Sequence, residues 1–172
     1  MALSGLLYDG TEFTTGGKCV KDVAGYSLRD LLVGSEGTLG IITEATVRLI
    51  TPPQDKRTFL AYFRDIRTAG EAVSKIIAGR IIPATLEIMD KMTINCVEDY
   101  AAIGLPRQME ALLLIEVDGH PAVVAEEAAG VRRVLQEVKA DEVHQAADAA
   151  EAARLAAARR TALSAVARVP PT

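Results

Sequence analysis

Cysteine, histidine and aromatic residues are scarce in this sequence, and each scarcity excludes a class of protein. Cys19 and Cys96 are the only cysteines, too few for a disulfide framework or a cysteine-ligated zinc site. His120 and His144 are the only histidines, and their spacing is not that of paired metal ligands, so we expect no metal site. Aromatic residues make up 4% of the chain, and no basic stripe accompanies them, so we expect no nucleic-acid partner.

Long apolar runs and an N-terminal targeting signal are also missing. No stretch approaches the roughly 20 consecutive apolar residues that a membrane helix needs. The N-terminus lacks the basic and apolar regions of a signal peptide. We therefore expect a cytoplasmic protein without membrane insertion. Its 172 residues are 49% hydrophobic and carry a net charge of −4, which is enough apolar material for one domain or two small ones.

Three glycines fall within seven residues of the stretch 22–43. Gly34, Gly37 and Gly40 follow a short helix signal and precede a β-branched run. Glycine at this density lets the backbone approach a ligand closely, and consecutive N–H groups in such a turn can form an anion-binding concavity. The spacing leaves two interpretations open, a site for a phosphate-bearing cofactor or a tight turn between a helix and a strand.

The pattern of residues 1–57 predicts a hairpin, a short helix and a third strand before a polar linker that contains proline. Ser27 is a candidate N-cap, with Asp30 three residues later, and Gly34 suits the end of the helix. The expected segments are a strand over 1–8, a turn at 9–10, a strand over 11–15, a helix that carries Leu28, Leu31 and Leu32, a strand over 43–49 and a linker over 51–57.

From residue 58 onward, strand and helix patterns alternate in the order β-α-β-α-β-α-β-α. This order predicts helices layered on a sheet, and crossovers of this kind occur in ferredoxin-like folds. Helix starts are expected at a T-x-x-E capping box over 68–71, at Asp90, at Pro121 and at Asp148. The expected strands cover 58–63, 84–89, 110–117 and 141–145.

Arg159 falls within the apolar stripe expected for the last helix. With about 100 degrees per residue, Leu155, Val166, Ala152 and Leu163 lie within about 80 degrees of one another, and Arg159 lies among them. An unpaired buried guanidinium is costly, and arginine matches a carboxylate bidentately. The periodicity alone leaves open a structural ion pair, an arginine that extends past a narrow stripe, or a ligand carboxylate.

Two stretches resemble a known family. Residues 21–49, K-D-V-A-G-Y-S-L-R-D-L-L-V-G-S-E-G-T-L-G-I-I-T-E-A-T-V-R-L, closely resemble the FAD-linked oxidases of the vanillyl-alcohol oxidase superfamily, in the branch that includes the FAD-binding subunit of glycolate oxidase and D-lactate dehydrogenase. The resemblance implies that residues 36–42 run along FAD, largely through backbone atoms. The residues implied are Glu36, Gly37, Thr38, Leu39, Gly40, Ile41 and Ile42.

The second stretch is R-L-A-A-A-R-R-T-A-L, residues 154–163. It resembles the family segment in which an L-W-x-x-R pattern supplies an arginine that binds the substrate carboxylate. Arg159 falls on that arginine, so the resemblance implies a substrate-binding role for it. Ala156 stands where the family has tryptophan, which implies a differently shaped pocket.

The resemblance also implies an α+β fold: residues 1–53 as the end of a vanillyl-alcohol-oxidase-type FAD-binding domain, and residues 54–172 as an incomplete ferredoxin-like α/β cap domain. The family's upstream glycine-rich loop and its downstream H-x-G-D-G-N-x-H-like stretch have no match here. We therefore interpret the chain as an internal piece of a longer protein. Because ligand pockets bury most of their ligand, we expect weak or absent FAD binding and no turnover by this piece alone.

Two functional hypotheses remain at this point. The resemblance implies that the parent protein is an FAD-dependent oxidoreductase that takes a hydride from the α-carbon of a small 2-hydroxy acid such as glycolate or D-lactate, with a catalytic base that the sequence does not identify. The alternative is a non-catalytic α+β interaction module that pairs with a partner subunit or with itself, since a truncated domain exposes apolar surface and strand edges.

Overall fold

The computed structural model describes residues 1–19, 21 and 25–168. The chain divides into two compact units, Met1–Pro52 and Pro53–Thr172. Each unit contains one antiparallel sheet with its own helices, which confirms the α+β class expected from the sequence. The assignment of residues 1–53 to an FAD-binding domain and of 54–172 to a cap domain stays a prediction. In the part of the chain that is described, no helix is long and apolar enough to cross a membrane.

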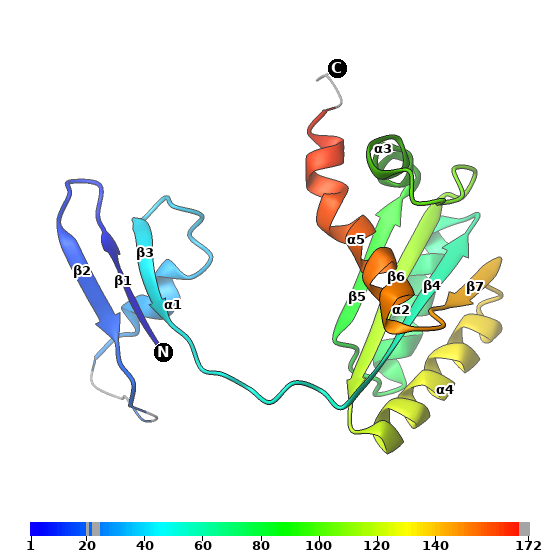
Figure 1. The fold of residues 1–172 in the computed structure, drawn as a ribbon, viewed down its shortest axis with the longest axis horizontal. Coiled ribbons are helices and arrows are strands. Elements are labelled where there is room, and N and C mark those ends of the chain that lie inside the picture. Colours follow the sequence, from blue (N-terminus) through cyan, green and yellow to red (C-terminus); the bar gives the residue numbers. More distant parts are fainter. Residues whose placement is uncertain (20, 22–24, 169–172) are drawn as a thin grey trace. The chain divides into compact units, whose positions relative to one another are not determined.

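The first unit is a three-stranded sheet with one short helix, α1 (Leu28–Leu32) (Figure 1). Its central strand is β1 (Ala2–Leu6), which pairs antiparallel with β2 (Glu12–Gly16) and with β3 (Ile41–Thr46). The predicted hairpin of the first two strands is confirmed. The third strand lies earlier than the expected 43–49, because its partner β1 offers pairing only between the registers Leu6–Ile41 and Ala2–Thr46.

The N-cap and the terminal glycine predicted for α1 are both confirmed. The Ser27 side chain accepts a hydrogen bond from the N–H of Asp30, and Gly34 follows the helix with φ of 86°. Of the three leucines expected on the inner face, only Leu32 is buried, and Leu28 and Leu31 are exposed. The helix is too short to cover more of the unit, so much of its apolar surface faces solvent.

The second unit is a four-stranded antiparallel sheet covered by helices on both faces (Figure 1). The strand order is β5-β6-β4-β7, which is the order of a ferredoxin-like βαββαβ fold with one additional helix between its second and third strands. The elements are β4 (Asp55–Phe63), α2 (Ile66–Ala78), β5 (Thr85–Asp90), α3 (Lys91–Ala101), β6 (Ala111–Gly119), α4 (Pro121–Glu137), β7 (Glu142–Gln145) and α5 (Ala149–Val166).

Two hydrophobic cores lie on opposite faces of this sheet, because successive strand side chains point in opposite directions. Phe59 and Phe63 of β4 face the core that α2 and α4 cover, whereas Leu60 and Tyr62 face the core that α3 and α5 cover. Burial raises the pKa of Tyr62 to about 12. The apolar residues at helical spacing along α4 and at its C-cap are all buried in the first of these cores: Val124, Ala128, Val131, Leu135 and Val138.

The helix starts are fixed by side-chain caps. Asp90 accepts a hydrogen bond from the N–H of Thr93, His120 caps α4 immediately before Pro121, and Asp148 caps α5, as the sequence indicates. The capping box predicted over 68–71 is wrong. Helix α2 begins earlier, because Asp65 lies two residues after the end of β4 and its carboxylate accepts from the N–H of Arg67, so the first turn is already capped before Thr68.

Candidate cofactor and substrate sites

Residues 36–42 form the turn that leads into β3 and the first part of that strand. Glu36 and Gly37 both have positive φ, 50° and 81°. Thr38 closes the turn by donating its N–H and its hydroxyl to the carbonyl oxygen of Ser35, at 2.9 and 2.6 Å. Among the residues that the structure describes, none accepts a hydrogen bond from the N–H of Gly37, and a Cβ at this position would meet nothing within 4 Å. The turn therefore presents open backbone that a ligand could approach.

The other side of this segment is fixed to the sheet. A Cβ at Gly40 would lie 2.9 Å from the carbonyl oxygen of Leu6, so only glycine allows the chain to run this close to β1. Leu39, Ile41 and Ile42 are exposed. The backbone of this segment is open on one side and packed against the sheet on the other, and its apolar side chains lie at the surface. These features suit a flat, partly apolar ligand such as a flavin dinucleotide. The residues present thus fit one wall of such a site.

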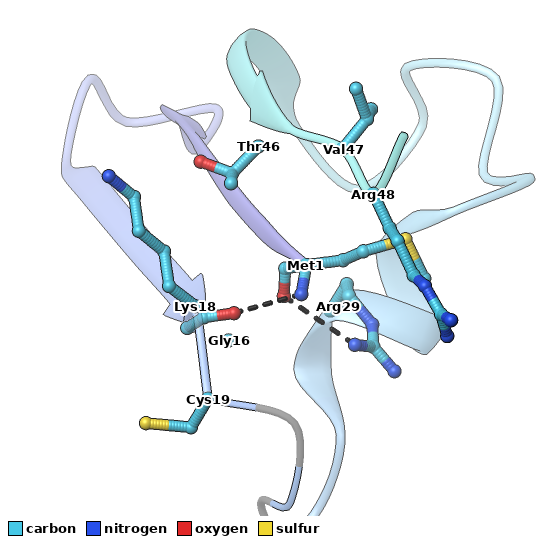
Figure 2. A pocket seen from close by; sticks show the side chains of 9 residues that line it. Met1, Gly16, Lys18, Cys19, Arg29, Thr46, Val47 and Arg48 are labelled. Atoms are coloured by element: carbon cyan, nitrogen blue, oxygen red, sulfur yellow. Dashed lines mark hydrogen bonds between the residues drawn. The ribbon is translucent and has the colours of Figure 1, made fainter. Parts of the chain in front are cut away.

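The first unit also has a hollow of about 690 Å³, shown in Figure 2, but the predicted cofactor residues do not line it. It lies where the start of β1 meets the end of β3, since Ala2 pairs with Thr46, whereas residues 36–42 lie at the other end of this pair of strands. The lining residues are Met1, Gly16, Gly17, Lys18, Cys19, Arg29, Thr46, Val47 and Arg48.

Cationic side chains border this hollow, and one of them is already engaged. Arg29 donates to both carboxylate oxygens of Asp30, at 2.8 and 3.0 Å, and this pairing lowers the pKa of Asp30 to about 2. Arg29 also reaches the carbonyl oxygen of Met1, at 3.5 Å (Figure 2). The hollow is therefore bordered by an arginine that is already paired, and it is distinct from the turn at 36–42.

Arg159 lies on α5 in the second unit, and its Nε forms an ion pair with Oε1 of Glu87 on β5. Its side chain is 55% exposed, so its expected place within a buried stripe is wrong. Leu163 is 82% exposed, whereas Ala165 is buried. Two positions of the expected stripe, Ala152 and Leu155, are buried, so the stripe is confirmed in part, whereas Leu163 and Arg159 of the same stripe are exposed.

The surrounding charges on α5 have other partners. Arg154 pairs with Glu151 at 3.4 Å, and Arg160 donates to the carbonyl oxygen of Ala153 at 3.4 Å. Of the arginines named here, Arg159 is the one paired to the sheet. This ion pair corresponds to one of the alternatives that the periodicity left open, and more than half of the Arg159 side chain stays exposed.

Glu87, the partner of Arg159, carries no signal in the sequence that would assign it to a site. It lies far from Arg159 along the chain, and its neighbours give only a strand pattern that ends at the cap Asp90. No local signal links a strand carboxylate to a distant helical arginine. The contact arises because β5 is an edge strand and α5 packs against the same face of the sheet as α3.

Comparison with known families and curated proteins gives a consistent result. Residues 52–171 match the family described as FAD linked oxidases, C-terminal domain. The glycolate oxidase subunit GlcD of Bacillus subtilis is 48% identical over 172 residues, which are 100% of this chain and 37% of that protein. The D-lactate dehydrogenase of Archaeoglobus fulgidus is 36% identical over 136 residues, 78% of this chain and 30% of that protein. The chain thus spans about a third of the length of the curated relatives it matches.

Solved structures share the fold at low sequence identity. The 4-ethylphenol oxidase from Gulosibacter chungangensis has a TM-score of 0.61 and 15% identity, with 94% of this chain and 37% of that chain covered. An alkyldihydroxyacetonephosphate synthase has a TM-score of 0.60 and 20% identity, with 96% and 31% covered. These similarities establish the fold and extend over both units.

Proposed function

Because this chain belongs to the family of FAD-linked oxidases, whose C-terminal domain its residues 52–171 match, we propose that the full-length protein is an FAD-dependent oxidoreductase acting on a small 2-hydroxy acid of the glycolate or D-lactate type. The observation that carries the proposal is the 48% identity to a glycolate oxidase subunit along the entire chain. A D-lactate dehydrogenase at 36% identity supports the same substrate class. The bound flavin would supply the redox chemistry by accepting the hydride.

Residues 36–42 would hold one side of the FAD. Glu36 and Gly37 have positive φ, and the N–H of Gly37 donates to no acceptor within the described part of the chain. Backbone N–H groups in such turns suit anionic or polar ligand atoms. Leu39 and Ile42 would contribute apolar surface beside them.

Arg159 would bind the substrate carboxylate. A planar guanidinium recognises a carboxylate through two parallel N–H···O bonds, and the exposed part of the Arg159 side chain leaves room for this contact. Ala156 lies three residues before Arg159 on α5, at the tryptophan position of the L-W-x-x-R pattern that this stretch resembles, so the pocket would differ in shape on that side. The proposed role of Arg159 is to anchor the substrate, and no residue of this chain is proposed as the catalytic base.

A second candidate function rests on the exposed apolar surface of the first unit. Its side chains include Leu28, Leu31, Val33, Leu39, Ile41, Val47 and Leu49, which is more apolar exposure than isolated surface residues normally give. This surface suits a binding interface, with a partner subunit or with another copy of the chain. Gel-filtration mass with and without FAD separates the candidates: a flavin-independent oligomer supports the interaction module, and a monomer that becomes more ordered with flavin supports the oxidase.

The first experiment is a visible absorption spectrum of the purified 172-residue chain after addition of FAD and desalting. We expect little retained flavin, because residues 36–42 supply only one wall of a site. Strong retained absorbance would contradict this expectation and would make direct assays with glycolate and D-lactate the next step.

The substrate assignment is tested in the flavin-loaded full-length protein. Arg159→Ala should raise KM for the preferred 2-hydroxy acid by about tenfold or more, because a charge-assisted bond to a carboxylate is worth about 1.5–3 kcal/mol. Arg160→Ala is the matched control, since Arg160 is the neighbouring arginine and pairs only with a backbone carbonyl in the described structure. Unchanged KM values for Arg159→Ala would contradict the assignment.

A further inference from the structure

The ion pair between Arg159 and Glu87 connects two elements that no backbone hydrogen bond joins. Glu87 lies on β5, an edge strand, and Arg159 lies on α5, which packs over the same face of the sheet. The Glu87 side chain is 33% exposed and the Arg159 side chain 55% exposed. The carboxylate is therefore the more enclosed partner, and it is held by the sheet.

The ion pair with Glu87 occupies only part of the hydrogen-bond donors of the Arg159 guanidinium. Arg159 contacts Glu87 through Nε. A guanidinium presents five N–H donors in a fixed planar fork, more than one carboxylate can occupy, so the group is able to receive a second carboxylate beside Glu87. The pair thus fixes the plane of the group without using its whole donor set.

The neighbours of Arg159 one turn away along α5 are all apolar, so none of their side chains offers the guanidinium a hydrogen-bond acceptor. They are Leu155, Ala156, Ala162 and Leu163. An arginine side chain has many rotamers, and binding a ligand normally costs the entropy of fixing one of them. A carboxylate held by the sheet fixes the Arg159 rotamer before the ligand binds.

We propose that Glu87 is a positioning residue, which holds the Arg159 guanidinium in the orientation that receives the carboxylate of a small 2-hydroxy acid. The inference rests on the proposed function, because it presupposes that Arg159 binds the substrate. It adds a residue that the sequence did not indicate, and it assigns the ion pair a role in binding as well as in holding α5 on the sheet.

The test uses the flavin-loaded full-length protein and three variants, Glu87→Ala, Glu87→Gln and Glu110→Ala. Glu87→Ala removes the partner of Nε, whereas the amide oxygen of Glu87→Gln can still accept from it. Glu110→Ala is the matched control, because it breaks an exposed ion pair of the same unit, with Lys91 at 2.6 Å, away from Arg159. The measurements are KM and kcat for glycolate and D-lactate, and calorimetric affinity for oxalate, a carboxylate that is not oxidised.

We expect Glu87→Ala to raise KM and to weaken oxalate binding by about fivefold, the equivalent of one hydrogen bond, with kcat changed less than twofold. Glu87→Gln should recover most of the affinity, and Glu110→Ala should match the unchanged protein. If Glu87→Ala leaves both affinities unchanged while Arg159→Ala lowers them, the inference fails and the proposed function stands. If Arg159→Ala also changes nothing, the proposed anchor fails as well. Tighter oxalate binding in both Glu87 variants would mean that Glu87 competes with the ligand, which also overturns the inference.

Discussion

His144 of β7 and Glu151 in the first turn of α5 are joined by a hydrogen bond of 2.9 Å between Nε2 and Oε1. The second carboxylate oxygen of Glu151 accepts from the N–H of Ala147, at 2.7 Å. One glutamate therefore connects the last strand, the connecting loop and the last helix. Donation from the Ala147 N–H, followed by the bond from His144, lowers the pKa of Glu151 from its ordinary value of 4.5.

The lowered pKa of Glu151 predicts a pH dependence with a definite sign. A carboxyl whose pKa is depressed by folding stabilises the native state above its ordinary pKa, and this contribution is lost as the pH falls through the folded-state pKa. The difference in unfolding free energy between the unchanged protein and Glu151→Gln should thus be largest near neutral pH and should shrink below about pH 4.5. Urea unfolding across this range measures it. Glu126→Gln, on the exposed face of α4, should show no such trend.

Two leucine truncations test the position of the second unit's cores. Leu113 is fully buried on β6, so Leu113→Ala should cost about 2–5 kcal/mol through lost burial and a residual cavity. Leu163→Ala should cost less than about 0.5 kcal/mol, because this side chain is exposed on α5 and alanine favours helix. Chemical denaturation monitored by circular dichroism measures both. A comparable loss in the two variants would contradict the observed face of α5.

Two glycines of this chain should respond to substitution by alanine in opposite ways, one because the backbone is closely packed and the other because alanine favours a helix. A Cβ at Gly5 would lie 2.3 Å from the carbonyl oxygen of Ile41, so Gly5→Ala should push β1 and β3 apart and open the first unit. Gly70 lies in α2 with no atom within 4 Å of an added Cβ, and Gly70→Ala should stabilise that helix by about 0.5–1 kcal/mol.

Hydrogen exchange resolved by residue is the appropriate measurement for both glycine variants, since a chain with two units need not unfold in one step. Gly5→Ala should speed exchange at the amides of β1 and β3 and leave the second unit unaffected. Gly70→Ala should slow exchange in α2. Faster exchange throughout the second unit in Gly5→Ala would show that the two units unfold together.

Neighbouring acidic residues on α3 give a further matched pair. The carboxylate of Glu98 accepts from three consecutive backbone N–H groups, those of Ile103, Gly104 and Leu105, at 2.9–3.1 Å. Glu98→Ala should cost about 1–3 kcal/mol, because these donors lose a charged partner.

Asp99 serves as the control for this carboxylate. It pairs with Arg107 at 2.7 Å, but its side chain is 70% exposed, so Asp99→Ala should cost less than about 1 kcal/mol. Urea unfolding and amide exchange over residues 103–105 measure the two effects. Equal losses would mean that the loop after α3 is held by its own packing and not by Glu98.

Local chemistry made much of this fold predictable. The spacing of apolar residues in α4 matched the buried face, because large β-branched and leucine side chains there dominate the pattern. Caps at Ser27, Asp90 and Asp148 were read correctly because each acts within one helical turn. The start of α2 was missed, since Thr68 and Asp65 both fit capping signals and only the end of β4 decides between them.

What the sequence did not reveal depends on distant contacts. The bounds of β3 follow from its pairing with β1, and the burial of Ala165 on α5 lay outside the expected stripe because alanines contribute little to a periodicity argument. The Glu87 partner of Arg159 could not be inferred from spacing for the same reason. The roles of residues 36–42 and Arg159 came from resemblance and stay predictions.

The strand order of the second unit has a consequence for how the chain acquires its structure. β4 is the first strand of this unit to be synthesised, yet its ladder partners are β6 and β7, with Phe59 opposite Ile115 and Gln145. Such a high contact order slows folding, because a long loop must close before pairing begins. During synthesis on the ribosome, the apolar residues 59–63 would stay unpaired and exposed until most of the unit has emerged. This strand is therefore where nascent-chain aggregation or chaperone capture is to be expected.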